Sequence, residues 1–87
     1  MVKGIQVGEE CWVCNAVTRD LSALLRVGKA ILRSEEKYGF ADCQLIGVNE
    51  HLGFAVEYEI FKTLEEIVER YGDNYIYYDG TLKTNNK

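Results

Sequence analysis

The chain has 87 residues, 47% of them hydrophobic, and a formal net charge of −4. This size and composition predict one modest core and argue against disorder, and we expect a single domain over residues 1–80 with a flexible polar tail over residues 81–87. No apolar run has the length of a signal-peptide core or a membrane span, and the three cysteines form no paired disulfide framework, so we expect a cytoplasmic protein with no membrane association.

The first expected element is a strand at residues 10–16, because apolar side chains occupy both of its alternating faces, as in an interior strand. Residues 5–7, which lie between two glycines, are a candidate for a short extra strand. After a cap at Thr18 or Asp20, apolar residues recur at helical spacing as far as residues 38–39. This pattern predicts an amphipathic helix of about five turns, closed by a glycine in a left-handed conformation.

A β-hairpin is expected next, with strands at residues 42–49 and 54–61. A short glycine-containing loop at residues 50–53 joins them. The second strand has the clearest alternation in the chain, with aromatic and branched residues on one face and acids on the other.

A second helix is predicted by the capping box Thr63-Leu64-Glu65-Glu66, in which the Thr63 hydroxyl accepts from the backbone three residues later. An apolar stripe follows, and the helix ends at Tyr71-Gly72. A last strand is expected at residues 74–78.

The resulting order is β-α-β-β-α-β, which predicts a ferredoxin-like α+β sandwich: a four-stranded antiparallel sheet with two helices on one face. The alternative is a smaller α+β fold whose first region is a hairpin. The order and the short length resemble ACT-type ligand-sensing domains and other ferredoxin-like modules. Thr18-Arg19-Asp20 stands where those domains have a glycine-bearing turn, so no ligand site is carried over.

The open face of this predicted sheet is the first candidate site. It would present two acids and two tyrosines and would suit a protein interface, in which tyrosine is enriched: Glu57, Glu59, Tyr75 and Tyr77. The acids would repel phosphates, so nucleic acid is not expected as a partner. The alternative is that the tyrosines only cover a half-exposed sheet.

A basic side of the first predicted helix is the second candidate. Its cations recur along one side and could bind a small anion such as a nucleotide or another anionic metabolite: Arg19, Arg26, Lys29 and Arg33. The alternative is an ordinary solvated face.

The motif Cys11-Trp12-Val13-Cys14 has the spacing of a redox pair or half of a zinc site. A strand, however, directs the two sulfurs to opposite faces, which favours two buried thiols. Neither Cys43 nor His51 completes a zinc site with good spacing. We therefore expect no metal, no cofactor and no catalytic residues.

These features predict a non-enzymatic protein-binding module, a small acidic inhibitor or regulator of a larger partner. A small-ligand sensor that binds an anion is the alternative, and a CxxC redox or zinc module is a further alternative. A protein partner is expected, and a homodimer is the other form of association that the sequence allows.

Overall fold

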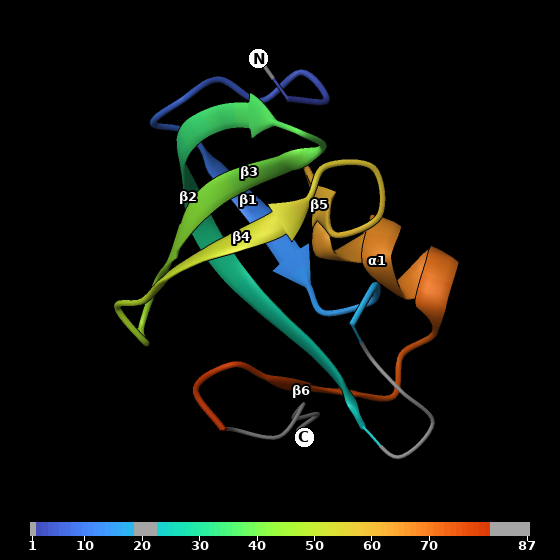
Figure 1. Cartoon of the computed structure of the whole chain (residues 1–87). Helices are drawn as coiled ribbons and strands as arrows, with labels where there is room; N and C mark the ends of the chain where they lie inside the picture. Colours follow the sequence, from blue (N-terminus) through green and yellow to red (C-terminus); the bar gives the residue numbers. More distant parts are fainter. Residues whose placement is uncertain (1, 19–22, 81–87) are drawn as a thin grey trace.

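Within residues 2–18 and 23–80, which the computed structural model describes, the chain folds as a curved, mainly antiparallel sheet with one helix packed against it (Figure 1). The elements are, in chain order, β1 (Glu10–Cys14), β2 (Leu25–Lys37), β3 (Phe40–Leu45), β4 (His51–Ala55), β5 (Ile60–Phe61), α1 (Leu64–Tyr71) and β6 (Tyr75–Tyr77).

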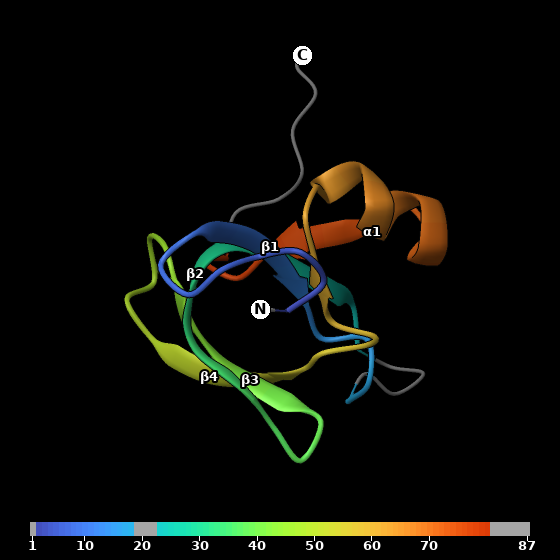
Figure 2. The same cartoon turned by 90° about the horizontal axis from the view of Figure 1, so that it is seen from above.

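Five strands form a continuous sheet in the order β4-β3-β2-β1-β5, and every pairing along this path is antiparallel. β6 lies off this path and pairs in parallel with the first residues of β2, so that Leu25 lies opposite Tyr75. Seen from above, β1 to β4 curl around a common interior and α1 lies outside the curl (Figure 2). We call this curled sheet the open barrel, because its edge strands β4 and β5 are not paired with each other.

β2 is the strand about which the open barrel bends. Its pairing with β3 shifts register between Leu32 and Ser34 and again between Ser34 and Lys37. Such irregularities bend a strand and increase its twist. β2 can therefore pair with β6 at its first residues, with β1 in its middle and with β3 over its second half (Figure 1).

The interior of the open barrel holds the first apolar cluster, to which β1 contributes Val13 and β2 contributes Leu32, both at 0% exposure. The N-terminal segment adds Val2 and Ile5, which are buried and whose backbones bond to each other. This pair is an isolated bridge, so the candidate strand at residues 5–7 does not form. The segment lies across one end of the barrel (Figure 1).

A second apolar cluster lies on the outer face of the sheet, beneath α1. Trp12 and Cys14 of β1 and Val27 of β2 belong to it, and Ile67 of α1 packs against them. Since other residues of β1 belong to the interior cluster, both faces of β1 are covered. This confirms the prediction of an interior strand in this region.

α1 begins and ends where the sequence predicts. Thr63 is its N-cap, and the Thr63 Oγ1 accepts a hydrogen bond from the Glu66 N–H at 3.3 Å. Gly72 is its C-cap with φ of 99°, and the Gly72 N–H donates to the Val68 carbonyl at 2.8 Å. The prediction succeeds because both end signals act within a few residues of the helix.

The predicted ferredoxin-like fold is wrong, because the segment predicted as the first helix forms β2. Leu25 and Val27 belong to the outer cluster, whereas Ala30 and Leu32 belong to the interior cluster. The buried face changes at Gly28, so the apolar residues of this strand follow a spacing that resembles a helical repeat. The alternative with a hairpin in the first region agrees with the antiparallel pairing of β1 and β2.

The predicted hairpin forms from β3 and β4, but its loop lies at residues 46–50. Residues 56–59, predicted as strand, form a turn in which the N–H groups of Tyr58 and Glu59 both donate to the Ala55 carbonyl. The predicted tail at residues 81–87 lies outside the described residues, as does the candidate cap Asp20.

Candidate functional site

The two tyrosines predicted to face outward, Tyr75 and Tyr77, belong to the outer cluster with α1. Tyr75 is buried, Tyr77 is half-buried, and their ring centroids lie 5.6 Å apart in an edge-to-face arrangement. Burial, together with a hydrogen bond to Tyr77, raises the pKa of Tyr75 to about 12. The expected exposed tyrosine face is therefore wrong, since β6 pairs with the start of β2 and its side chains pack with the helix.

The predicted acidic pair is divided by the turn that follows β4. Glu57 is exposed, but Glu59 is only 3% exposed. The Glu59 carboxylate accepts the Ala55 N–H at 2.8 Å and the Val17 N–H at 3.0 Å, one on each oxygen. The expectation that Glu59 faces solvent is wrong because strand alternation does not apply to a turn.

The predicted basic residues do not share one side, because they lie on a strand. Lys29 forms an ion pair at 3.2 Å with Glu10 of β1, which lies diagonally across from it, opposite Ile31. Arg33 bonds to a side chain of β3, whereas Arg26 lines a separate cleft near the start of β2. Arg19 lies outside the described residues.

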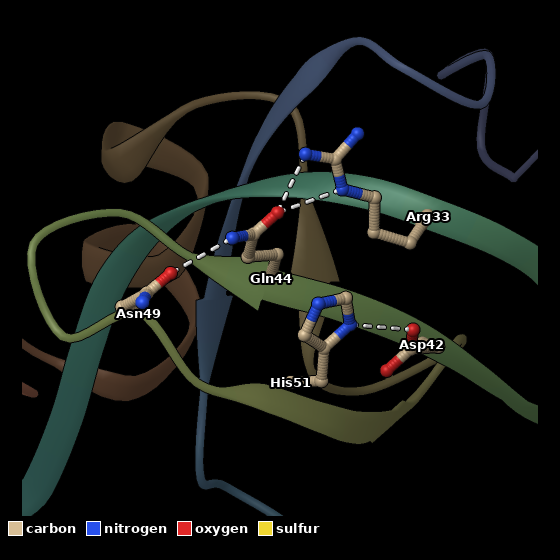
Figure 3. Close-up of polar contacts among 5 residues, drawn as sticks. All are labelled: Arg33, Asp42, Gln44, Asn49 and His51. Carbon is tan, nitrogen blue, oxygen red and sulfur yellow. Dashed lines mark hydrogen bonds and ion pairs between the residues drawn. The ribbon is translucent and has the colours of Figure 1, made fainter.

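A row of polar side chains crosses the surface of β2, β3 and the loop before β4 (Figure 3). Arg33 Nε donates to Gln44 Oε1 at 2.8 Å, and Gln44 Nε2 donates to Asn49 Oδ1 at 3.0 Å. Beside them, His51 Nδ1 lies 3.0 Å from Asp42 Oδ2, with side chains 54% and 38% exposed. Exposed pairs of this kind link neighbouring strands and contribute little to stability. None of these five residues lines either of the two hollows described below.

The cysteine motif is divided between the two apolar clusters. Cys11 lies inside the open barrel with Cys43, whereas Cys14 lies in the outer cluster. A hydrogen bond between the Cys11 and Cys43 thiols, together with burial, raises the pKa of Cys43. All three cysteines are free and buried, and Cys11 and Cys14 occupy opposite faces of β1, so this arrangement does not support a redox or zinc pair.

We expect all three thiols to remain unreactive toward Ellman's reagent in the native protein, because their exposure is 0% or 1%. In urea, all three should titrate at a rate set by unfolding. The measurement is the absorbance of the thiolate released from the reagent, followed over time with and without urea. Fast labelling of any thiol in buffer would show that the strand carrying it, β1 or β3, is more open than the structure indicates.

An apolar groove of about 330 Å³ lies where the β2–β3 turn meets the turn after β4. We call it the aromatic groove, and its main lining residues are Val17, Tyr38, Phe40, Val56, Glu57 and Tyr58. Its exposed side chains include Val17 at 50%, Tyr38 at 90%, Phe40 at 50% and Tyr58 at 47%. Exposed aromatic residues gathered in one patch are typical of protein-binding surfaces.

Tyr38 occupies an unusual backbone conformation at the edge of this groove. Lys37 and Phe40 pair directly, so the turn has two residues, Tyr38 and Gly39, with φ of 57° and 85°. Both positive φ values match a type I′ turn, in which Asn-Gly is preferred. A bulky residue at positive φ is uncommon and costs backbone energy, which points to a role for the exposed ring outside the fold.

Glu59 holds the two walls of the aromatic groove together. Val17 and Ala55 both line the groove, from the segment after β1 and from the end of β4. Their N–H groups donate to the two oxygens of the same Glu59 carboxylate. The groove therefore depends on one buried acid that does not itself line it.

A second hollow, of about 580 Å³, opens between β4, the start of β2 and β6. We call it the mouth cleft, and its lining includes Leu24, Arg26, Phe54, Glu59, Ile76 and Tyr78. Of the residues predicted from the sequence, the structure therefore brings Arg26 and Glu59 to the mouth cleft and Glu57 to the aromatic groove.

Tyr38, Phe40 and Tyr58 were not predicted as site residues. The available signal was Tyr38-Gly39, a pair with turn character between two apolar segments, in which tyrosine stands where a hairpin prefers asparagine. A glycine after a tyrosine also ends α1, so the same local pair fits a helix end and a hairpin turn.

No family model, curated protein or solved structure matches this chain. Within residues 2–18 and 23–80, no helix is both long and apolar enough to cross a membrane. The same described residues hold no group of three or more histidine, cysteine and acidic side chains placed to share a metal ion.

Proposed function

We propose that this chain is a non-enzymatic protein-binding module whose aromatic groove holds an extended, basic segment of a partner protein. By occupying such a segment it acts as an inhibitor or regulator of that partner. Its three free cysteines support a reducing compartment, the cytoplasm, as the place of action.

The exposed ring of Tyr38 carries this proposal. At 90% exposure and φ of 57°, its side chain makes a small contribution to the buried core and its backbone favours a different residue. Neighbouring Phe40 and Tyr58 add further exposed aromatic surface on the same groove. Tyrosine is a frequent source of binding energy in patches of this kind.

The shape and charge of the groove favour one kind of occupant. Aromatic-lined grooves can hold an extended segment, and a segment that already favours the polyproline II form loses less backbone entropy on binding. Glu57 at the groove and the chain's net charge of −4 favour Lys or Arg in that segment. A second copy of this chain fits less well, because two copies of like net charge repel each other.

The test is a selection of random peptides on phage against the immobilised protein, followed by titration of the enriched peptides. We expect enriched sequences to combine apolar residues with Lys or Arg. Tyr38→Asn should weaken their binding by about tenfold or more, while leaving stability equal or higher, because Asn-Gly suits the turn.

Ile46→Ser is the matched control, since Ile46 is 45% exposed but does not line the groove. This variant should bind the peptides as well as the unaltered protein. Glu57→Lys should shift a repeated selection from basic to acidic peptides. Equal losses in Tyr38→Asn and Ile46→Ser, or full binding by Tyr38→Asn, would remove the aromatic groove as the site. Self-association detected by light scattering would favour the second copy instead.

A further inference from the structure

The mouth cleft has the dimensions of a small-molecule site. Its volume of about 580 Å³ falls within the range of roughly 300–1,000 Å³ that is usual for ligand pockets. It opens at the mouth of the open barrel, between Gly53 on the edge strand β4 and Ile76 on β6. The aromatic groove has a separate set of lining residues, so the two hollows are distinct surfaces.

One wall of the cleft is apolar. Phe54 is buried at 3% exposure, and its ring packs edge-to-face with Tyr78 at a centroid distance of 6.0 Å. Ile76 is half-buried, while Leu24 at 51% and Leu52 at 38% expose apolar surface at the rim. A flat apolar body could cover these side chains and remove their surface from water.

Arg26 supplies the positive charge of the cleft. Its backbone N–H donates to the Asn15 Oδ1 at 2.8 Å, which fixes this end of β2. Within the described part of the chain, the guanidinium of Arg26 has no hydrogen bond or ion pair. A guanidinium presents a planar fork of donors that matches a carboxylate or a phosphate.

The other polar groups of the cleft are either bonded within the fold or able to donate a hydrogen bond. The one buried acid, Glu59, already accepts two backbone hydrogen bonds. The Asn15 side chain is also bonded within the fold. Its Nδ2 donates to the Leu24 carbonyl, and its Oδ1 accepts from the Arg26 N–H. The Tyr78 hydroxyl makes no hydrogen bond to the described residues, and burial raises its pKa, so it stays protonated as a donor.

The edge of β4 adds a backbone donor to the same cleft. The Ala55 N–H points away from β3, because it donates to Glu59. Gly53 is two residues earlier, so its N–H points the same way. Gly53 is exposed and lines the cleft, so this backbone is accessible.

We propose that the mouth cleft binds a small organic anion, whose carboxylate or phosphate pairs with Arg26 and whose flat apolar body lies against Phe54 and Ile76. Tyr78 and the Gly53 N–H donate to its remaining polar atoms. Its lining residues are separate from those of the aromatic groove, although Glu59, which lines the cleft, also holds the walls of the groove.

The test uses three probes on one ring system: 2-naphthoate, 2-naphthyl phosphate and the neutral 2-naphthamide. Each is titrated into the isotope-labelled protein and followed in ¹H–¹⁵N correlation spectra. We expect both anions to shift the amides of Arg26, Gly53 and Tyr78, and the amide probe to bind about tenfold more weakly. The anion that binds more tightly shows whether the cleft prefers a carboxylate or a phosphate.

Arg26→Gln should remove the preference for the anions, whereas Lys29→Gln should retain it, because Lys29 lies on the same strand but pairs with Glu10. Equal binding of the anions and the amide, or shifts centred on other residues, would overturn the proposal. Arg26→Gln should also keep its affinity for the selected basic peptides, so failure here is distinguishable from failure of the aromatic groove.

Discussion

Glu59→Ala is expected to lower the free energy of unfolding by about 2 to 4 kcal/mol, because it leaves one buried and one partly buried backbone N–H group without an acceptor and opens a small cavity. These groups belong to Val17 and Ala55, which donate to the carboxylate at 3.0 and 2.8 Å. Urea unfolding followed by circular dichroism measures the change.

Glu57→Ala is the matched control, since Glu57 is two residues away and exposed. It should change stability by no more than about 0.5 kcal/mol. Glu59→Gln retains one acceptor oxygen and should fall between the two alanine variants, with weaker binding of peptides in the aromatic groove. A loss of stability in Glu59→Ala as small as that in Glu57→Ala would show that the Glu59 carboxylate does not hold the segments of Val17 and Ala55 together.

Gly28→Val is expected to destabilise the protein by about 2 to 3 kcal/mol, because it overpacks a filled part of the interior. A Cβ at residue 28 would lie 3.0 Å from the Tyr78 Cδ2 and 3.2 Å from the Leu45 Cδ2. Tyr78 would have to move, so the shape of the mouth cleft should change as well. Urea unfolding measures the loss, and the binding of 2-naphthoate reports on the cleft.

Gly53→Val is the control for this variant, because the same addition at residue 53 meets nothing within 4 Å. Its stability should be equal to or higher than that of the unaltered protein, since valine favours strands. A loss in Gly53→Val that matches the loss in Gly28→Val would mean that glycine is needed for backbone reasons at both positions. The tight packing at Gly28 would then not explain the effect.

Elements with local signals were predictable from the sequence, and α1 shows why. Its cap at Thr63 and its end at Gly72 are set by hydrogen bonds within four residues of one another. β1 was predictable for a related reason, since a strand covered on both faces must be apolar on both. These signals do not depend on the arrangement of distant parts of the chain.

β2 was not predictable in this way. Leucine, arginine, lysine, alanine and glutamate in this segment favour helix. The strand forms because β1 and β3 pair along its two edges and because Tyr78 packs over Gly28, more than forty residues away in sequence. Tertiary contacts override the local preference here, as is common for strands.

The candidate sites were only partly visible in the sequence for the same reason. Arg26, Glu57 and Glu59 were chosen by charge, and the structure places each at a hollow or beneath one. Tyr38 and Tyr58 come from different turns, and the pairing of β3 with both β2 and β4 brings these turns together. The spacing of residues within one strand or turn does not indicate that Tyr38 and Tyr58 lie close together.

The most direct test of the aromatic groove is chemical-shift mapping with a basic peptide enriched by the phage selection. Our account predicts that the largest amide shifts lie at Val17, Gly39, Phe40, Val56 and Tyr58, which line the groove, and that at the same peptide concentration they become much smaller in Tyr38→Asn. The largest shifts at Arg26, Gly53 and Tyr78, or shifts that persist unchanged in Tyr38→Asn, would contradict it.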